Sequence, residues 1–325
     1  WYRIRKKQFK MKKNSFVFLA GHNGLVGKSV FNLLKNEGFR NIITVDRKKL
    51  DLRNFEKVRK FFNKKKIDYM VMAAARAGGI IANSSNQKDF YLENVEIQNS
   101  LLKLALEKKI KRTIYLGTSC IYPKFAKNPI TEDSLLTGEL EKTNQCYAIA
   151  KISGIKLSEA LFNDYKLNII CLMPTNVYGL NDNFDMINGH VIPAMISKFI
   201  EAKKKKKREI RLLGTGKPVR EFIHSSDLAH AIFICLKSSQ KKIKNLFKNK
   251  LPIINVGSGE SLTILKLSKI IAKELEYNGN IVFDKNFPDG TYKKNLNSEK
   301  ILKLGWKPKI KLSTGISEVI KYRNI

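Results

Sequence analysis

The chain has 325 residues, which is long enough for one large α/β domain and a smaller lobe around a substantial core. Its apolar content of 43% is that of a globular protein, and no apolar run approaches the roughly 20 residues that a membrane helix needs. The net charge of +34 would suit nucleic-acid binding, but the lysine-rich runs 64–66 and 203–208 lack interleaved aromatic side chains. We therefore expect a basic surface that favours anionic small molecules, with no nucleic-acid or membrane partner.

The four cysteines are widely spaced, and none of them belongs to a Cys-x-x-Cys pair. This spacing argues against a zinc site or a disulfide framework, so we expect no metal and a reduced, cytosolic protein. Residues 1–10 are basic, but the apolar stretch that follows, Phe16–Ala20, is too short for the core of a signal peptide. We expect Met11 to be the natural start and leave residues 1–10 out of the fold prediction.

The first predicted unit is a strand, a glycine turn and a helix. Phe16–Ala20 is a short apolar run typical of a buried parallel strand, and the helical spacing of Val30, Leu33 and Leu34 follows the turn. Such glycines let the backbone approach a pyrophosphate, whose charge lies at the helix N-terminus. The unit predicts a dinucleotide site formed by the turn residues Gly21, Asn23, Gly24, Leu25, Val26 and Gly27.

The second strand, Asn41–Val45, ends at the residues that would read the cofactor ribose. An acid such as Asp46 favours a free 2′-hydroxyl, whereas a following arginine such as Arg47 favours a 2′-phosphate. Asp46 favours NAD and Arg47 favours NADP, so these positions alone do not decide between the two cofactors.

Strands and helices continue to alternate through the first half of the chain. The further strands expected there are Tyr69–Ala75, Thr113–Gly117 and Leu167–Met173, and the helices are Phe55–Phe62, Asp89–Glu107 and one that carries Tyr147. This alternation predicts an α/β fold with a doubly wound parallel Rossmann sheet over residues 11–176.

The alternation loosens after Val177, which predicts a smaller α/β substrate lobe over residues 177–325, with some segments returning to the Rossmann sheet. Its expected helices are His190–Ile200, Asp227–Leu236 and Leu262–Leu275, and its expected strands are Glu209–Leu213, Arg220–Ile223, Ile253–Val256 and Ile281–Phe283. We expect the lobe to close over the ligand edge of the sheet.

Tyr147 and Lys151 are four residues apart in the expected helix and therefore share one of its faces. A lysine ammonium beside a phenol favours the phenolate and lowers the tyrosine pKa from its free value of roughly 10. Such a pair can exchange a proton with a carbonyl or alcohol oxygen. Thr118-Ser119-Cys120 ends the strand before this helix, at the edge where open α/β sheets bind ligands. Together with the glycine turn, these residues indicate a nicotinamide-dependent enzyme.

With these motifs in place, the chain resembles the extended short-chain dehydrogenase/reductases and, more closely, the GDP-L-fucose synthase family, from about Asn14 to Trp306. The stretches that carry the resemblance in the first half are Ala20-Gly-His-Asn-Gly-Leu-Val-Gly27, Gly117-Thr-Ser-Cys-Ile-Tyr-Pro-Lys124, Tyr147-Ala-Ile-Ala-Lys-Ile-Ser-Gly-Ile-Lys156 and Met173-Pro-Thr-Asn176. Those in the second half are His190-Val-Ile-Pro-Ala194, Pro218-Val-Arg-Glu-Phe222, Ile254-Asn-Val-Gly257 and Pro288-Asp-Gly-Thr291. The glycine motif and the Tyr/Lys pair define only the superfamily, whereas Cys120, His190 and the Pro-Asp-Gly element are specific to the narrower family.

The resemblance implies epimerisation at C3 and C5 of a GDP-4-keto-6-deoxy-hexose, together with NADPH-dependent reduction at C4. The family's reduction triad falls on Thr118, Tyr147 and Lys151, with Thr118 in place of the serine of close relatives. Tyr147 would protonate the C4 oxygen, and Lys151 would hold the nicotinamide ribose. Cys120 and His190 would be the epimerisation base and acid.

The same resemblance assigns further residues to the two ligands. Besides the glycine turn, Arg47 and Lys151, the implied cofactor contacts are Asp51, Leu52, Leu116, Gly117, Thr118, Ser119, Pro174, Thr175, Asn176, Val177 and His190. The implied contacts to the nucleotide sugar are Ser119, Cys120, Asn176, Lys198, Leu213, Arg220 and Asp289. No catalytic role is implied for His22, His224 or His230.

Two positions depart from the family pattern. Leu213 stands where close relatives have a tryptophan that contacts the substrate, and the loss of an aromatic wall loosens the grip on the ligand. Asn23 stands where they carry an arginine that helps to read the 2′-phosphate. Arg47 keeps NADP ahead of NAD.

The sequence therefore predicts a cytosolic NADP-dependent epimerase and reductase of a GDP-4-keto-6-deoxy sugar. An alternative within the class is a C4-reductase of a related GDP-4-keto sugar, such as a heptose, with little or no epimerisation. An alternative of another class is a basic Rossmann module that binds RNA or a protein partner without turnover, and the intact triad argues against it.

We also expect a homodimer, because members of the family pair through the helix Asp89–Glu107 and the helix that carries Tyr147. The apolar contacts between the two subunits are expected from Leu101, Leu102, Ala105 and Leu161.

Overall fold

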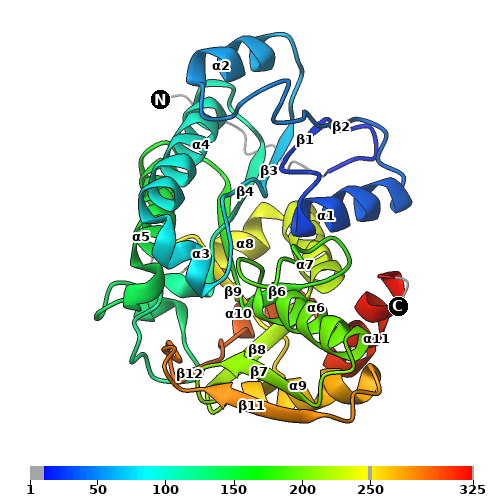
Figure 1. The fold of residues 1–325 in the computed structure, drawn as a ribbon. Helices are drawn as coiled ribbons and strands as arrows, with labels where there is room; N and C mark the ends of the chain where they lie inside the picture. The colour runs from blue at the N-terminus through cyan, green and yellow to red at the C-terminus, as the bar shows by residue number, and fades with distance from the viewer. Residues whose placement is uncertain (1–10, 248–250, 324–325) are drawn as a thin grey trace, which may run out of the picture.

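The structure is a computed structural model that describes residues 11–247 and 251–323 (Figure 1). Residues 1–10, which were left out of the fold prediction, lie outside the described part, and the start at Met11 stays a prediction. Among the described residues, no helix combines the length and the apolar character needed to cross a membrane. A large parallel sheet between helices occupies one end of the molecule, and a smaller lobe occupies the other (Figure 1).

The large sheet is six-stranded and has the order β2-β1-β3-β4-β5-β9. Its strands are β1 (Val17–Ala20), β2 (Ile42–Ile43), β3 (Tyr69–Met72), β4 (Arg112–Leu116), β5 (Ile169–Pro174) and β9 (Ile253–Val256). Neighbouring strands pair in parallel, as the βα alternation predicted. The predicted doubly wound Rossmann fold is therefore confirmed. β9, which belongs to the second half of the chain, pairs with β5 at the edge of this sheet.

Helices cover both faces of the sheet because successive side chains of a strand point to opposite sides. Val17 and Leu19 face one layer, made of α1 (Leu25–Asn36), α7 (Ser225–Lys237) and α8 (Gln240–Leu246). Phe18 and Ala20 face the other layer, made of α2 (Phe55–Asn63), α4 (Gln87–Glu107) and α5 (Gln145–Asp164). Figure 1 shows the strands between α4 and α5 on one side and α1 and α7 on the other.

The four residues expected at a dimer interface lie in the second of these layers. Leu101, Leu102 and Ala105 are fully buried, and Leu161 is 6% exposed, all within the core between the sheet and its helices. The prediction that they contact another subunit is therefore wrong, because the chain's own sheet already covers that helix face.

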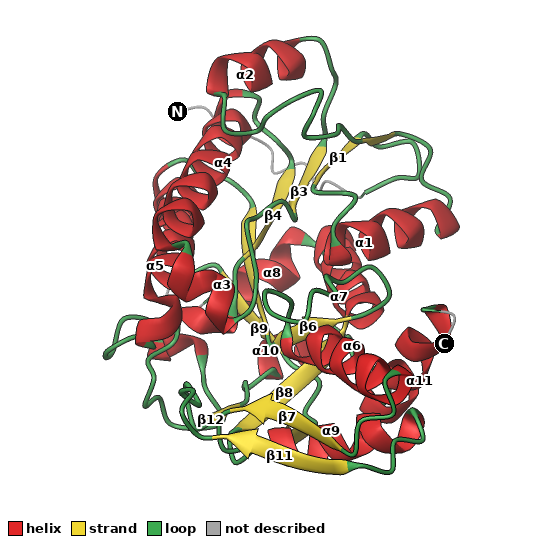
Figure 2. Ribbon diagram, in the orientation of Figure 1, coloured by secondary structure: helices red, strands yellow, loops and turns green. Residues whose placement is uncertain are grey.

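The lobe is built from two smaller sheets and three main helices (Figure 2). In the first sheet, β8 (Val219–His224) pairs with β6 (Asn176–Tyr178), β10 (Ser261–Thr263) and β12 (Lys293–Lys294). In the second sheet, β7 (Glu209–Leu213) pairs in parallel with β11 (Asn280–Asp284). The helices α6 (Val191–Lys204), α9 (Ile264–Glu274) and α11 (Leu312–Tyr322) share one apolar core with β6, β7, β8, β10 and β11.

Several elements were not predicted, and except for α11, which has 11 residues, they span too few residues to show a hydrophobic period. Besides β6, β10, β12, α8 and α11, they are α3 (Ile80–Ser85), η1 (Ser119–Ile121), η2 (Glu132–Ser134), η3 (Lys142–Asn144) and α10 (Glu299–Lys303). The helix predicted from Leu262 begins later, since Ser261–Thr263 pairs as β10 and the Thr263 side chain caps α9 by accepting from Lys266 N.

Candidate active site

The glycine turn joins β1 to α1 at the carboxyl end of the large sheet. Gly21 has a φ of +81°, and a Cβ on it would lie 2.6 Å from Ala74 N. A Cβ on Gly27 would lie 1.9 Å from Gly21 O, so both positions require glycine. α1 begins just after its N-cap residue Gly24 and has no acidic side chain in its first turn, so its N-terminus keeps its positive character. This backbone fits the pyrophosphate of a dinucleotide.

A cavity of about 620 Å³ extends from this turn along the strand ends and into the lobe. The predicted site residues that line it are Gly24, Leu25, Val26, Leu116, Gly117, Thr118, Ser119, Cys120, Tyr147, Lys151, Pro174, Thr175, Asn176, Val177, His190, Lys198, Leu213, Arg220 and Asp289. The predicted residues outside its lining are Gly21, Asn23, Gly27, Arg47, Asp51 and Leu52. The cavity thus brings together segments from both halves of the chain.

The residues expected at the cofactor ribose form two separate contacts. Asn23 Nδ2 donates to Asp46 Oδ1 at 2.7 Å, and His22 Nε2 lies 3.5 Å from the same oxygen. The Arg47 side chain is 68% exposed, and its Nη2 lies 3.3 Å from Glu93 Oε2 on α4. Since a guanidinium has five N–H donors, Arg47 keeps donors for an anion, while Asn23 holds the Asp46 carboxylate.

Asp51 and Leu52 follow this region and lie outside the lining of the cavity. Asp51 Oδ2 accepts from Arg53 Nη2 at 2.6 Å, and this hydrogen bond holds the Asp51 pKa below its ordinary value. Leu52 packs against the core of the α2–α4 layer.

Thr118, Tyr147 and Lys151 come together where β4 ends beside α5. The Thr118 side chain hydrogen-bonds the Tyr147 phenol, and its hydroxyl also accepts from Cys120 N at 3.2 Å. Lys151 is 4% exposed, and its Nζ donates to Leu116 O at 2.9 Å. The predicted triad therefore shares one wall of the cavity.

The predicted effect of Lys151 on Tyr147 is wrong for this structure. Desolvation raises the pKa of Tyr147 above its ordinary value, and the hydrogen bond from Thr118 offsets this only in part. Desolvation also lowers the pKa of Lys151 to about 8, and its ammonium faces the Leu116 carbonyl. A phenol with a raised pKa keeps its proton at neutral pH, so Tyr147 is suited to donate a proton.

Cys120 lies in η1, two residues beyond Thr118, and has two polar neighbours. Asn144, which directly precedes α5, donates from Nδ2 to Cys120 Sγ at 3.4 Å. Arg220 of β8 is near enough for its charge to interact with the sulfur. The sulfur therefore has a hydrogen-bond donor and a cation in its surroundings.

His190 is the N-cap residue of α6, so the helix predicted to begin at His190 begins one residue later. Its Nδ1 lies 3.0 Å from Asp182 Oδ1, and the Asp182 side chain is 3% exposed. Burial disfavours the imidazolium, but the Asp182 carboxylate outweighs it and raises the pKa of His190 above its ordinary value. His190 is therefore suited to carry and return a proton near neutral pH.

At the lobe end of the cavity, Arg220 and Asp289 are held by their neighbours. Arg220 Nη2 donates to Asp289 O at 3.2 Å. The Asp289 carboxylate accepts from the N–H and the hydroxyl of Thr215, at 2.7 and 2.6 Å. Leu213 is 39% exposed, and burial lowers the pKa of Lys198. This end offers two cations and an open aliphatic wall.

Asp182 and Asn144 were missed by sequence reasoning. Asp182 belongs to a polar stretch that was predicted only as a loop, and Asn144 precedes the helix of Tyr147 without any motif that links it to Cys120. Asparagine and aspartate are also common in turns, so neither residue type drew attention to a role in the site.

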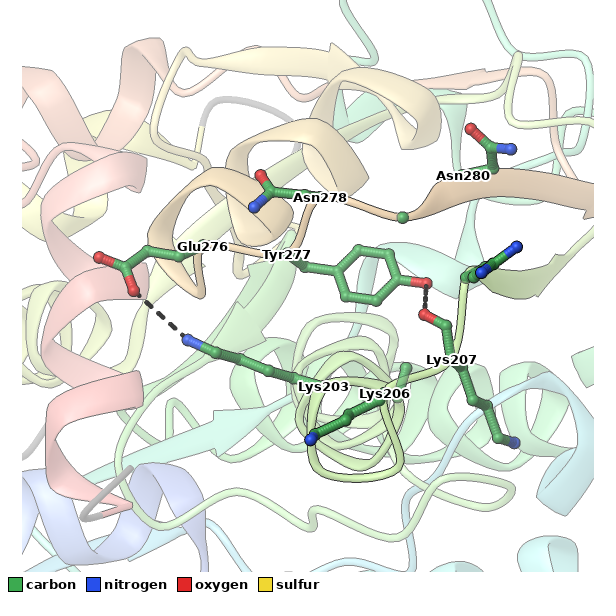
Figure 3. Close-up of a pocket in the computed structure, with 10 residues that line it drawn as sticks. Lys203, Lys206, Lys207, Glu276, Tyr277, Asn278 and Asn280 are labelled. Carbon is green, nitrogen blue, oxygen red and sulfur yellow. Dashed lines mark hydrogen bonds and ion pairs between the residues drawn. The ribbon is translucent and has the colours of Figure 1, made fainter.

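A second hollow, of about 400 Å³, lies where the end of α6 meets the segment after α9 (Figure 3). Lys203, Lys206 and Lys207 line it together with Tyr277 and Glu276. Lys203 Nζ lies 3.4 Å from Glu276 Oε2, and the Tyr277 hydroxyl donates to Lys207 O at 3.1 Å (Figure 3). Its lining is separate from the predicted site residues and contains four basic residues, Lys203, Lys206, Lys207 and Arg208.

Comparisons with known proteins agree over most of the chain. A family model described as the NAD dependent epimerase/dehydratase family matches residues 17–257. GDP-L-fucose synthase 1 of Arabidopsis thaliana is 41% identical over 306 residues, which cover 94% of this chain and 92% of the relative. A GDP-6-OMe-4-keto-L-xylo-heptose reductase from Campylobacter jejuni has a TM-score of 0.91 at 32% identity, covering 97% of this chain and 99% of that chain. MlghC, a GDP-mannoheptose C4 reductase from the same organism with NADP bound, has a TM-score of 0.87 at 32% identity, covering 97% and 100%.

Proposed function

We propose the following function for a chain that belongs to the NAD dependent epimerase/dehydratase family and, as its motifs predicted, to the GDP-L-fucose synthases within it. It is an NADPH-dependent epimerase and reductase activity on a GDP-4-keto-6-deoxy-hexose. One observation carries this proposal. A triad for ketone reduction and a Cys/His pair for proton exchange line the same cavity, next to the glycine turn. A cavity with both sets of groups can act on two neighbouring parts of one 4-keto sugar.

Reduction at C4 requires a hydride and a proton. NADPH supplies the hydride when it is bound at the glycine turn. Tyr147 holds its proton because desolvation raises its pKa, and it gives this proton to the C4 oxygen. Thr118 orients the phenol through their hydrogen bond. We assign Lys151 to the nicotinamide ribose, since its Nζ lies at the end of β4, where it donates to Leu116 O.

Epimerisation requires protons to leave and return at C3 and C5. The C4 ketone acidifies both positions, and Cys120 takes a proton on Sγ, to which Asn144 donates a hydrogen bond. The negative charge that develops on the sugar spreads to the C4 oxygen, next to the Tyr147 phenol. His190 then returns a proton to the opposite face.

The nucleotide sugar and the cofactor are assigned to opposite ends of the cavity. We assign Arg220 and Lys198 to the diphosphate, because a guanidinium binds phosphate in a bidentate way and both side chains line the lobe end. We assign Arg47 to the 2′-phosphate of NADPH, because its exposed guanidinium retains free donors beside the strand end that reads the ribose.

A C4-reductase of a GDP-linked heptose, with little or no epimerisation, is the second candidate function. Two similar solved structures are named as GDP-heptose reductases. A tryptophan at position 213 would narrow the sugar end of the cavity. The smaller side chain of Leu213 leaves more space there and favours a larger sugar.

A panel of GDP-4-keto sugars tests the proposal. The purified enzyme is incubated with NADPH and either the 6-deoxy-hexose or a heptose, NADPH consumption is followed, and the products are identified by NMR. We expect turnover of the 6-deoxy-hexose with inverted configuration at C3 and C5. Turnover of the heptose alone, or a reduced product with unchanged C3 and C5, would favour the second candidate.

We also propose a homodimer that pairs through the outer faces of α4 and α5. Leu92 on α4 is 45% exposed and Ile149 on α5 is 41% exposed, so each helix keeps an aliphatic side chain for a partner. The expected mass at micromolar concentration is that of a dimer, and L92E combined with I149E should reduce it to a monomer. A monomeric mass for the native chain would contradict this assembly.

For the chain organisation, we propose a cofactor part over 11–176 and a substrate lobe over 177–325 from which β9 returns to the large sheet. NADPH should protect amides of the first part, and GDP those of the second, from hydrogen exchange.

We propose a cytosolic location, which agrees with the free thiols of Cys120, Cys146, Cys171 and Cys235 and is testable by cell fractionation.

A further inference from the structure

The loop before α6 brings a carboxylate against the ring of His190. Asp182 Oδ1 lies 3.0 Å from His190 Nδ1, and the Asp182 side chain is 3% exposed. Because a carboxylate oxygen only accepts hydrogen bonds, Nδ1 must carry the proton in this contact. Nε2 is then left for the cavity that His190 lines.

A chain of side-chain to backbone hydrogen bonds fixes the geometry of this loop. Asn183 N donates to Asp182 Oδ1 at 2.8 Å, so the same oxygen is held from a second direction. The Asp185 carboxylate accepts from Ile187 N and Asn188 N, at 2.9 and 2.6 Å. A Cβ on Gly189 would lie 2.4 Å from Asp185 O, so the loop closes tightly just before His190. The loop therefore fixes the Asp182 side of the Asp182–His190 contact.

The second carboxylate oxygen of Asp182 has a different environment. Oδ2 is buried and has no hydrogen-bond partner among the described residues. A buried carboxylate gains stability from a positive charge beside it, so the site favours the imidazolium of His190.

Other charged side chains line the same cavity, and they come from α5, α6, β8, β12 and the intervening loops: Lys151, Lys198, Arg220, Lys294, Glu141 and Asp289. Among the described residues, Asp182 is the charged group whose interaction shifts the pKa of His190, and the direction of that shift is upward. Removal of the Asp182 charge should therefore move the titration of His190 to lower pH.

We propose that Asp182 is a positioning residue for epimerisation, which fixes the tautomer of His190 and keeps the ring charged so that Nε2 can return a proton to the sugar. This inference rests on the proposed epimerase activity and extends it to a residue outside the Cys120/His190 pair. A lone histidine delivers a proton from either nitrogen, whereas this one delivers it from Nε2 only.

The variant that tests the role is Asp182→Asn, which keeps the shape and the acceptor for Asn183 N but removes the charge. With GDP-4-keto-6-deoxy-mannose, NADPH and deuterated buffer, we measure the ratio of epimerised to unepimerised reduced product over a range of pH. We expect this ratio to fall by roughly 10- to 100-fold at neutral pH, part of the 10² to 10⁴ that a positioned acid or base contributes. The high-pH limb of the ratio should move down by about one pH unit, because the imidazolium loses its proton sooner.

Asp185→Asn is the matched control, because it alters the same loop without touching His190. A purely structural effect would lower the ratio in both variants and leave the pH limb in place, which would overturn the inference. Asp182→Glu restores the carboxylate and should recover part of the ratio.

A measurement on the wild-type protein covers the case in which D182N fails to fold. The ¹⁵N resonances of the histidine rings report which nitrogen is protonated, and we expect the Nδ1–H tautomer for His190 when it is neutral. An Nε2–H tautomer, or an unchanged ratio and pH profile in D182N, would overturn the role of Asp182 while leaving epimerisation intact. Absence of any epimerised product from the wild-type enzyme would instead overturn the proposed function, and this role with it.

Discussion

The reduction centre and the epimerisation centre share one cavity, but they are built in different ways. Tyr147 and Lys151 are on one face of α5, and Thr118 follows β4, so regular secondary structure sets their spacing. Cys120 lies in a short 3-10 turn and contacts Asn144, which directly precedes α5. His190 lies at the end of an irregular loop and contacts Asp182 of the same loop. This difference predicts that mutations can separate the two activities, although both act on one sugar.

Tyr147→Phe should give the largest effect and separates the two centres directly. Loss of the phenol proton should reduce NADPH oxidation by about 10² to 10⁴, as expected for a general acid. Exchange of sugar protons with deuterated water should continue, since Cys120 and His190 remain, but more slowly, because the phenol no longer stabilises charge on the C4 oxygen. Tyr165→Phe, at a tyrosine that is 61% exposed, is the control and should behave as wild type. Equal loss of both activities in Y147F would show that the centres are not independent.

Arg47→Ala tests whether the Arg47 guanidinium makes the enzyme prefer NADPH over NADH. A charge-assisted hydrogen bond to a phosphate is worth about 1.5–3 kcal/mol, so the KM for NADPH should rise by roughly 10- to 100-fold. The KM for NADH should hardly change, because NADH lacks the 2′-phosphate. Arg59→Ala on α2, an arginine paired with Glu107, is the control for loss of a surface charge. A native enzyme that uses both cofactors equally would show that Asp46 governs the choice.

The pH dependence of kcat/KM for NADPH should distinguish Lys151 from Tyr147. Lys151 has a pKa lowered to about 8, so its charge is present below that pH and lost above it. The pKa of Tyr147 is raised, so the phenol keeps its proton over the same range. We expect kcat/KM to fall about tenfold per pH unit above pH 8. Lys151→Arg stays charged and should lose this limb if it retains activity, whereas a wild-type profile that is flat to pH 10 would exclude Lys151 as the titrating group.

Leu213→Trp should give the smallest effect and sharpens the description of the sugar end. An added aromatic contact is worth about 0.5–1.5 kcal/mol, so the KM for the GDP-sugar should fall by roughly 2- to 10-fold, with the KM for NADPH unchanged. Leu265→Trp on α9, at an equally exposed leucine outside the cavity, is the matched control. An increase in KM for the hexose in L213W alone would indicate that the open wall is needed to admit the sugar.

The parts of the fold that could be predicted are those whose signal is local. The strands of the large sheet are short apolar runs, and the glycine turn needs small residues at fixed spacing. Leu101, Leu102 and Ala105 show the limit of this reasoning, because a helix period marks an apolar face without saying what covers it. The pairing of β9 with β5 joins distant segments, and no local pattern specifies such a neighbour.

The candidate site follows the same division. The spacing of Tyr147 and Lys151 is local and was predicted, and the structure places both in the cavity. The direction of the Tyr147 pKa was wrong, because desolvation depends on packing that the spacing does not describe. The contact between Asp182 and His190 depends on how an irregular loop folds back, so sequence reasoning identified His190 by family resemblance and missed its partner.

The central claim is that one cavity carries both proton exchange at carbon and ketone reduction. The most direct test is to run the wild-type reaction with GDP-4-keto-6-deoxy-mannose and NADPH in deuterated water and to locate deuterium in the product by NMR. We predict deuterium at C3 and C5 in the wild-type product, and about 10²-fold slower incorporation in the nearly isosteric variant Cys120→Ser. A wild-type product reduced at C4 but without deuterium at C3 or C5 would contradict the claim and leave a plain C4-reductase.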